Sequence, residues 1–188
     1  MREIVVSQFV TLDGVMEDPG GAEGFERGGW AFRFERGPEG DKFKLDEVMA
    51  ADALLLGRVT YEGFAEAWPS RTGEFADKFN GMRKYVVSTT LHDPEWSNST
   101  VISGGVAEEV AKLRAQDGGD VLVNGSAQLV RTLVEHDLVD EYRLMVFPVV
   151  LGSGKRLFDD GLPQMPLELV ETRQTGEVAI LILRPAGR

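Results

Sequence analysis

The chain has 188 residues, of which 43% are hydrophobic, and this is enough to bury the core of one domain spanning residues 1–188. Its 31 acidic and 20 basic residues give a net charge of −11, which repels nucleic acid and anionic membranes, and no apolar segment is long enough to cross a bilayer. Because cysteine is absent, disulfides, thiolate metal sites and thiol nucleophiles are excluded, and we expect a soluble cytoplasmic protein.

The amino-terminal part begins with a predicted strand at 3–10, EIVVSQFV, whose β-branched and aromatic residues suit a buried position. The turn TLDG follows at 11–14. Residues 18–40 are rich in glycine but also contain Phe25, Trp30, Phe32 and Phe34. Loops of this length in compact domains are usually functional lids or disordered, and the aromatic residues favour an ordered lid.

Beyond residue 40 the pattern alternates between helices and strands. Two final strands follow each other without a helix, separated by Thr175-Gly176, and this predicts an antiparallel hairpin that closes a mostly parallel sheet in an α/β fold. The predicted helices are 41–52, 59–68, 105–116 and 126–137, and the predicted strands are 53–56, 84–90, 99–103, 120–125, 140–151, 167–174 and 177–185.

Three of these strands end in residues that suit a phosphorylated ligand. They are followed by Gly57-Arg58-Val59-Thr60, Ser88-Thr89-Thr90 and Asn124-Gly125-Ser126-Ala127. Small residues let a ligand approach the backbone, a helix amino terminus offers free amides, and Arg58 adds a charged donor. The alternative is that these are ordinary turns in which Thr60 and Ser126 cap helices. Together, the turns suit a dinucleotide laid across a sheet edge, although no G-x-G-x-x-G fingerprint follows any strand.

Two other glycine-containing segments give weaker evidence of a ligand site. The segment LGSGKRLF at 151–158 is not a Walker motif, because Val149 stands where a glycine is needed and Arg156 where a serine or threonine is needed. Ser103-Gly104-Gly105 precedes a predicted helix and suits a helix cap better than a ligand site.

Acid–base candidates are few. His92 and His136 lie in polar stretches that suggest solvated side chains, and no catalytic Ser-His-Asp arrangement or metal-binding spacing is found. Asp13 in the TLDG turn and Asp41 at the predicted helix start flank the glycine-rich segment and are the candidate catalytic acids. The alternatives are that Asp13 forms the turn and Asp41 caps the helix.

Five segments in order, TLDGVME, GRVTYEGF, KYVVSTTL, VNGSAQLVRTL and FPVVLGSGKRLF, together resemble the dihydrofolate reductase-like fold across nearly the whole chain. The chain is most similar to stand-alone proteins resembling the carboxy-terminal reductase domain of bifunctional riboflavin biosynthesis deaminase-reductases. The resemblance implies a three-layer fold and an NADPH-dependent reductase of a small pteridine-like or ribosylamino-pyrimidine substrate. The zinc deaminase half of the bifunctional enzymes is not expected, since cysteine is absent.

The resemblance also assigns residues. It implies that Val10 to Met16 approach the nicotinamide, that Trp30 closes over the substrate, and that Asp13, with Asp41 as a second candidate, lies near the reacting atoms. The implied cofactor contacts are Val10, Gly57, Arg58, Thr60, Ser88, Thr89, Asn124, Gly125, Ser126 and Ala127. Because Thr89 and Thr90 are uncharged, recognition of the 2′-phosphate falls to Arg58.

Two further expectations concern function and assembly. The alternative to a reductase is a nucleotide-binding module of the same fold that has lost catalysis, and turnover of NADPH would separate the two. The strands at 140–151 and 177–185 are more apolar than a monomer's sheet edge should be, and similar proteins are often dimers, so we expect a homodimer.

Overall fold

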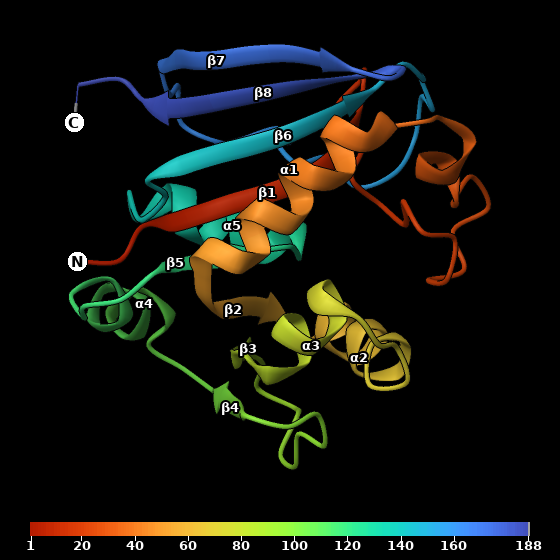
Figure 1. The fold of residues 1–188 in the computed structure, drawn as a ribbon. Helices are drawn as coiled ribbons and strands as arrows, with labels where there is room; N and C mark the ends of the chain where they lie inside the picture. Colours follow the sequence, from red (N-terminus) through yellow and green to blue (C-terminus); the bar gives the residue numbers. More distant parts are fainter. Residues whose placement is uncertain (188) are drawn as a thin grey trace.

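A computed structural model describes residues 1–187, which are built around one eight-stranded sheet (Figure 1). The strand order is β4-β3-β2-β5-β1-β6-β8-β7. All pairs from β4 to β6 are parallel, whereas β6 with β8 and β8 with β7 are antiparallel. The predicted mostly parallel sheet with a closing antiparallel hairpin is therefore confirmed.

The strands and helices match most of the predicted segments. The strands are β1 (Ile4–Thr11), β2 (Ala51–Gly57), β3 (Arg83–Val87), β4 (Ser99–Ile102), β5 (Asp120–Val123), β6 (Glu141–Phe147), β7 (Leu167–Thr175) and β8 (Val178–Pro185). The helices are the short 3-10 helix η1 (Trp30–Arg33) and α1 (Gly37–Ala50), α2 (Arg58–Ala67), α3 (Glu74–Gly81), α4 (Val106–Arg114) and α5 (Ala127–Glu135). None of the helices in residues 1–187 has the length and apolar content needed to cross a membrane.

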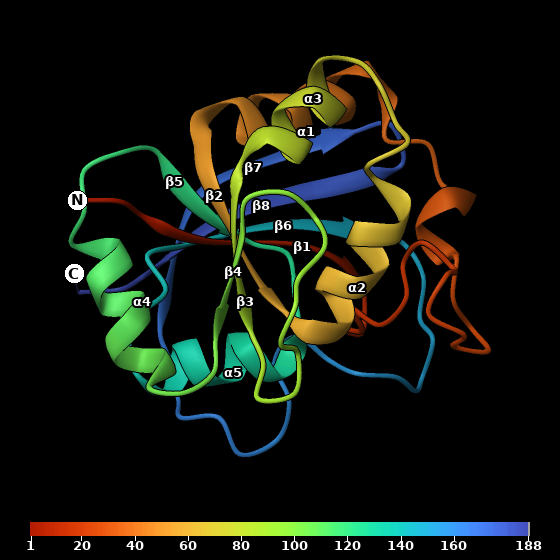
Figure 2. The same cartoon turned by 90° about the horizontal axis from the view of Figure 1, so that it is seen from below.

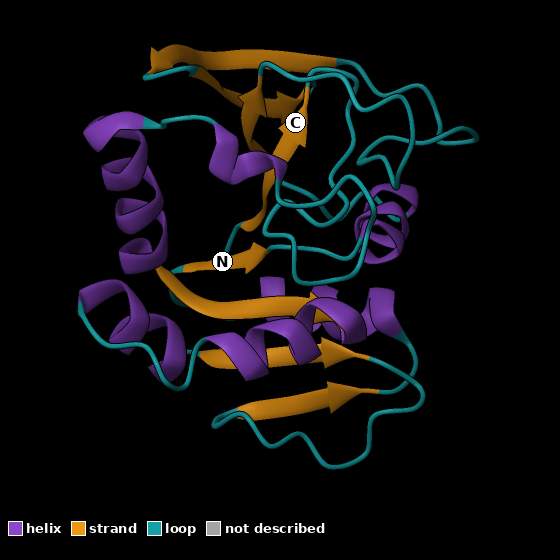
Figure 3. Cartoon of the chain, turned by 90° about the vertical axis from the view of Figure 1, so that its right-hand side faces the viewer, coloured by secondary structure: helices purple, strands orange, loops and turns teal. Residues whose placement is uncertain are grey.

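The helices lie in two layers, one on each side of the sheet (Figures 2 and 3). α1, α2 and α3 pack on one face, where Val48, Tyr61 and Phe79 contact Leu54 and Leu122 of the central strands. α4 and α5 pack on the other face. Successive strand residues point to opposite faces, so the buried strands β1, β2 and β5 supply apolar residues to both layers.

Helix α5 illustrates how the sequence pattern sets this packing. Leu129, Val130, Leu133 and Val134 are buried and recur at the three- and four-residue spacing of one helix face. Ser126 is the N-cap, and its hydroxyl accepts a hydrogen bond from the amide of Leu129 at 3.4 Å. The capping alternative considered for Ser126 from the sequence is therefore present in the structure.

Three of the differences from the prediction are larger than the others: two element ends and one missed helix. α1 begins at Gly37 with Pro38 in its first turn, so Asp41 lies inside the helix and the expectation that it caps the start is wrong. β6 ends at Phe147 rather than residue 151, because Pro148 has no amide hydrogen to donate. Helix α3 was missed, although Phe75, Ala76 and Phe79 have helical spacing.

The glycine-rich segment between β1 and α1 is ordered by two buried residues. The carboxylate of Asp18 accepts hydrogen bonds from the amides of Glu23 and Phe25 at 3.0 and 3.1 Å. Trp30 is fully buried, and its indole nitrogen donates to the carbonyl of Glu17 at 2.9 Å. Trp30, with Phe25 and Phe34 packed against the same cluster, thus anchors the segment to the core, as the argument against disorder expected, whereas Phe32 is exposed.

The sheet order removes the sequence argument for a homodimer. β6 lies between β1 and β8, and β8 lies between β6 and β7, so both apolar strands are interior and are paired on each side. The actual edges are β4 and β7, and β7 exposes Leu169 and Val170. A homodimer stays an untested prediction, and the apolar composition of β6 and β8 is explained by their place within the sheet.

A buried lysine holds the carboxyl end of α3. Lys84 on β3 has no exposed surface, and its ammonium donates to the carbonyl oxygens of Asn80, Met82 and Ser97 at 2.5, 2.9 and 3.0 Å. It also lies 4.2 Å from the ring centre of Trp96. Burial lowers the pKa of Lys84 to about 8, so that the side chain is mainly charged at neutral pH.

Replacing Lys84 with methionine should lower the free energy of unfolding by about 2–3 kcal/mol, because three buried carbonyl oxygens lose a charged donor. Urea denaturation followed by circular dichroism measures this. Lys112→Met is the control, since Lys112 is exposed and paired with Glu109, and exposed pairs contribute little to stability. Equal losses of unfolding free energy in both variants would show that the three Lys84 hydrogen bonds add no more stability than an exposed ion pair.

Candidate functional site

The candidate site begins at the carboxyl edge of the sheet, where β2 and β5 lie side by side. The turn after β2 and the turn after β5 touch each other: the amide of Gly57 donates to the carbonyl of Gly125 at 3.0 Å. A side chain on Gly57 would come within 2.5 Å of the Ser126 hydroxyl, and one on Gly125 within 2.8 Å of the Thr60 hydroxyl. The two glycines are thus required by the contact between the turns themselves.

This contact brings the amino termini of α2 and α5 together. The N-cap of α2 is Gly57, which offers no side-chain acceptor, so the first amides of α2 have no capping side chain. Each helix amino terminus carries a partial positive charge, and two at one point attract an anion more strongly than one. The predicted residues Gly57, Thr60 and Asn124 to Ala127 therefore lie together.

Arg58 is the first residue of α2, and its side chain is exposed. Its guanidinium makes an ion pair with Glu62, one helical turn later, at 2.8 Å. An exposed pair of this kind contributes about 0.2–1 kcal/mol, so a bound phosphate could replace Glu62 at small cost.

The third predicted turn lies next along the edge, because Val87 pairs with Gly57 in the sheet and Ser88 follows directly. Ser88 is buried, and its hydroxyl accepts from the amides of Thr90 and Leu91 at 3.1 and 3.0 Å, which shapes the turn. Thr89 is exposed and free to face a ligand. Ser88 thus contributes structure to the turn, whereas Thr89 offers the accessible hydroxyl.

Asp13 joins two loops. Its carboxylate accepts from the Thr11 hydroxyl at 2.6 Å and from the amides of Leu151 and Gly152 at 3.2 and 2.8 Å. Partial burial raises the pKa of Asp13, but these hydrogen bonds outweigh it and hold the pKa below its usual value. Both oxygens are engaged, so the geometry gives Asp13 the turn-forming role and does not favour proton donation.

The structure does not place three other predicted residues in a catalytic site: one is exposed and paired with an arginine, and two are buried in the core. Asp41 is exposed on the outer side of α1 and pairs with Arg36 at 2.9 Å. Trp30 is fully buried and packs edge-on against Phe147, with ring centres 5.3 Å apart. The side chain of Val10 lies in the core on the α4 and α5 side. Catalytic roles for Asp13 and Asp41 and a substrate role for Trp30 stay predictions.

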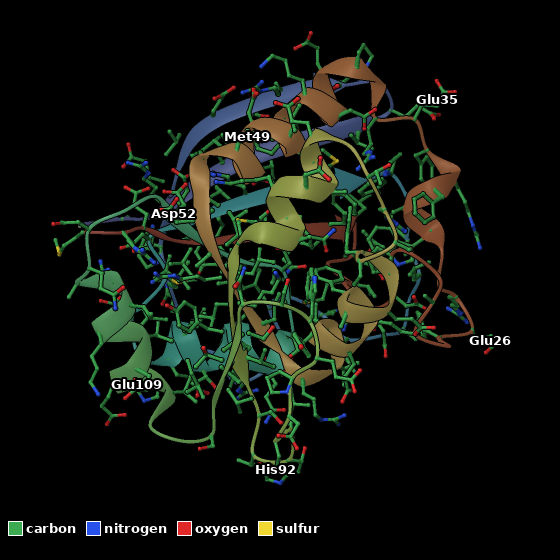
Figure 4. All side chains as sticks on the ribbon, turned by 60° about the horizontal axis from the view of Figure 1, so that its bottom comes forward. Glu26, Glu35, Met49, Asp52, His92 and Glu109 are labelled. Carbon is green, nitrogen blue, oxygen red and sulfur yellow. The ribbon has the colours of Figure 1, made fainter. Side chains whose placement is uncertain are left out.

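The structure also bears on the two histidines and on the segment 151–158. His92 and His136 are both exposed, and Figure 4 shows His92, Glu26 and Glu109 projecting outward at separate places on the surface. The segment 151–158 pairs with the turn after β1, since the amide of Met16 donates to Lys155 at 2.8 Å. It does not lead into a helix, as a phosphate-binding Walker loop would.

The sequence argument missed a group of polar residues between α1 and the sheet. Ser7 on β1 and Lys44 and Glu47 on α1 are joined by hydrogen bonds of 2.5 to 2.9 Å. Asn124 connects them to the turn after β5, because its side-chain amide donates to the carbonyl of Ser7 at 3.0 Å. The sequence did contain one signal of this group. Ser7 directly follows the apolar run 4–6, and the structure shows that it is buried.

Comparisons with known proteins agree with this fold. The sequence model of the RibD C-terminal domain matches residues 2–181. The uncharacterized proteins YyaP and YwjB of Bacillus subtilis (strain 168) are each 31% identical, over 92% and 96% of this chain and 88% and 96% of their own.

Two solved structures share the architecture. A putative riboflavin biosynthesis protein from Shewanella sp. PV-4 has a TM-score of 0.77 at 18% identity, with 97% of this chain and 98% of that chain covered. A diaminohydroxyphosphoribosylaminopyrimidine deaminase/5-amino-6-(5-phosphoribosylamino)uracil reductase from Thermotoga maritima has a TM-score of 0.61 at 14% identity, with 98% and 57% covered. At these identities the structures support the fold.

Substituting Gly57 with alanine should lower the free energy of unfolding by about 1–3 kcal/mol, because the new methyl group would overlap Ser126. Gly63→Ala is the matched control within α2, the helix that Gly57 precedes; no atom lies within 4 Å of the added group, and it should raise stability by about 0.5–1 kcal/mol. Thermal unfolding of both variants measures the difference. A Gly57→Ala protein as stable as the control would contradict the proposed contact between the turns.

Asp13→Asn should destabilise the fold at neutral pH, because the amide nitrogen replaces one carboxylate oxygen and cannot accept the hydrogen bonds that this oxygen receives, either from Gly152 or from Thr11 and Leu151. The folded pKa of Asp13 is lowered, so its contribution is present above the unfolded value of 3.8 and is lost as the pH falls through the folded pKa. Denaturation curves of both proteins from pH 7 to below pH 4 should therefore converge at the acidic end. A constant gap across this range would assign the loss to something other than the carboxylate charge.

Proposed function

Because the chain belongs to the RibD C-terminal domain family, the reductase domain of riboflavin biosynthesis enzymes, we propose that it is an NADPH-dependent reductase of a small pteridine-like or ribosylamino-pyrimidine substrate. The observation that carries the proposal is the contact of the β2 and β5 turns, which holds the α2 and α5 amino termini together at the sheet edge. Such a pair of positive helix ends suits the two phosphates of one dinucleotide.

The residues present fit the cofactor. The first amides of α2 have no side-chain cap, and Arg58 and Thr89 are exposed on neighbouring turns. The buried Oδ1 atom of Asn124, just before the β5 turn, has no hydrogen-bond partner in the described structure. A cofactor that brings phosphate oxygens to the amides and N–H groups to the acceptor satisfies these groups.

Each part of the site has a distinct task in this proposal. Bound NADPH supplies a hydride to an electrophilic C=N or C=O carbon. The backbone amides of the α2 and α5 turns hold the phosphates, and Arg58 exchanges Glu62 for the 2′-phosphate. Asp13 fixes the turn after β1 against residues 151–152, and this turn forms the wall beside the nicotinamide and limits the entry of water.

The second candidate is a nucleotide-binding module without catalysis. It is favoured by the positions of the two predicted acids, since both oxygens of Asp13 are engaged and Asp41 is exposed and paired with Arg36. The two candidates differ in turnover. A reductase consumes NADPH only when substrate is present, whereas a binding module binds NADPH without consuming it.

The test is calorimetric titration with NADPH and NADH, followed by measurement of NADPH oxidation with 5-amino-6-(5-phosphoribosylamino)uracil and with a 7,8-dihydropterin. We expect NADPH to bind more tightly than NADH and to be oxidised with one of these compounds. Binding without oxidation would select the module, and a failure to bind either nucleotide would overturn the cofactor assignment.

Arg58→Ala should weaken NADPH binding by about 10- to 100-fold, because a charged contact to phosphate is lost, and should leave NADH nearly unchanged. Glu62→Gln is the matched control: it frees Arg58 from its ion pair and should leave NADPH binding equal or slightly tighter. Equal losses for both nucleotides would make Arg58 a general phosphate contact.

A further inference from the structure

The polar group between α1 and the sheet is compact and mostly buried. Lys44 donates to the Ser7 hydroxyl at 2.6 Å and to Oε2 of Glu47 at 2.5 Å, and the Ser7 hydroxyl donates to the same oxygen at 2.9 Å. Ser7 is 1% and Glu47 4% exposed, whereas the Lys44 side chain keeps 16% of its surface. Lys44 is therefore the member of the group that keeps the most exposed surface.

Two buried acceptors beside Ser7 lack partners. Oε1 of Glu47 has no hydrogen-bond partner in the described structure, nor has Oδ1 of Asn124. Glu47 is bonded to the Ser7 hydroxyl, and Asn124 is bonded to the Ser7 carbonyl. Buried acceptors are normally satisfied, so two such oxygens around one serine indicate a place for a ligand that carries N–H or O–H groups.

An aromatic surface lies beside these groups. Phe9 is two residues after Ser7 on the same face of β1, is half-buried and packs against Phe147 with ring centres 5.3 Å apart. The Lys44 ammonium lies 5.4 Å from the centre of the Phe9 ring, and the Arg36 guanidinium lies 5.3 Å from it. The Phe9 ring therefore has two cations over it, and Lys44 interacts with both this aromatic residue and Glu47.

We propose that Lys44 is the residue that donates a proton to the substrate, and that Glu47 is a positioning residue that holds its ammonium in place. The substrate class is a planar heterocycle with an N–H or amino group, which the free oxygens of Glu47 and Asn124 accept, beside the C=N or C=O group that is reduced. This inference rests on the proposed function, since the reductant is NADPH.

The groups named above account for each bond, electron pair and proton in the proposed reduction. The hydride equivalent from NADPH forms the new C–H bond, and the electron pair of the C=N or C=O π bond moves to nitrogen or oxygen. That atom forms a bond to the proton as an N–H bond of the Lys44 ammonium breaks. The neutral amine then recovers a proton from water, which reaches it through the exposed part of the side chain.

A purely structural ion pair is the competing explanation, and the variants must separate the two. Lys44→Arg keeps the charge, but a guanidinium does not release its proton at neutral pH. A structural role predicts a normal kcat for this variant, whereas proton donation predicts that kcat falls while KM changes little. Because Lys44→Met leaves the buried Glu47 unpaired, Lys44→Met/Glu47→Met is the second variant, since apolar replacement of a whole buried pair is often tolerated.

The experiment measures the NADPH dissociation constant, kcat and KM, with 5-amino-6-(5-phosphoribosylamino)uracil and the dihydropterin as probes. We expect Lys44→Arg and the double variant to lose about 10²- to 10⁴-fold in kcat, as general acid removal does, and to bind NADPH within about twofold of the parent. Glu47→Gln keeps the shape but loses the charge, and should lose about tenfold in kcat. Lys42→Met is the matched control, because Lys42 is exposed on the same helix and paired with Asp46.

The outcomes distinguish this inference from the proposed function. If the parent oxidises NADPH with a probe and Lys44→Arg does so with the same kcat, the inference is overturned and the reductase proposal stands. If the parent binds NADPH but turns over neither probe, the reductase proposal fails for these compounds and the inference falls with it. If NADPH does not bind, the cofactor assignment is the part that has failed.

Discussion

The contact between the Gly57 and Gly125 turns is the constraint on which the candidate site depends. One hydrogen bond of 3.0 Å joins the turns, and neither glycine has room for a side chain against Ser126 or Thr60. Parallel strands end at the same edge, so the order β3-β2-β5 places three strand ends in a row. The close approach of two turns then converts separate helix ends into one region of positive potential.

The two faces of the sheet differ in their content of buried polar groups. The α4 and α5 face is a large apolar cluster, whereas the α1 face carries Ser7, Glu47 and Arg143 beneath a helix. Burial lowers the pKa of Arg143, but its hydrogen bond to Glu141 and the charges of Glu141, Glu47 and Asp120 outweigh this and raise the pKa. Helix α1 is thus held to β1 partly by the hydrogen bonds of Lys44 and Glu47 with Ser7, which are directional and keep the polar residues in fixed positions relative to β1.

Much of the architecture followed from local pattern, and the errors have physical causes. The β–α alternation and the closing hairpin were predictable, because buried parallel strands are continuous apolar runs and helices repeat every three to four residues. Helix α3 was missed because its eight residues contain few apolar positions. Interior strands were mistaken for edges at β6 and β8, because strand order depends on pairing between distant segments and not on composition.

The sequence by itself determined the fold class, the family and the residues of the three turns that follow β2, β3 and β5, since each depends on neighbouring residues along the chain. Only the tertiary structure decided which polar residues meet. It turned Asp41 outward to Arg36, engaged both oxygens of Asp13, and brought Lys44 and Glu47 to Ser7, about 40 positions away in the chain. The reason is that a side chain's neighbours are set by the packing of a helix on a sheet, and a shift of one residue around that helix exchanges a buried position for an exposed one.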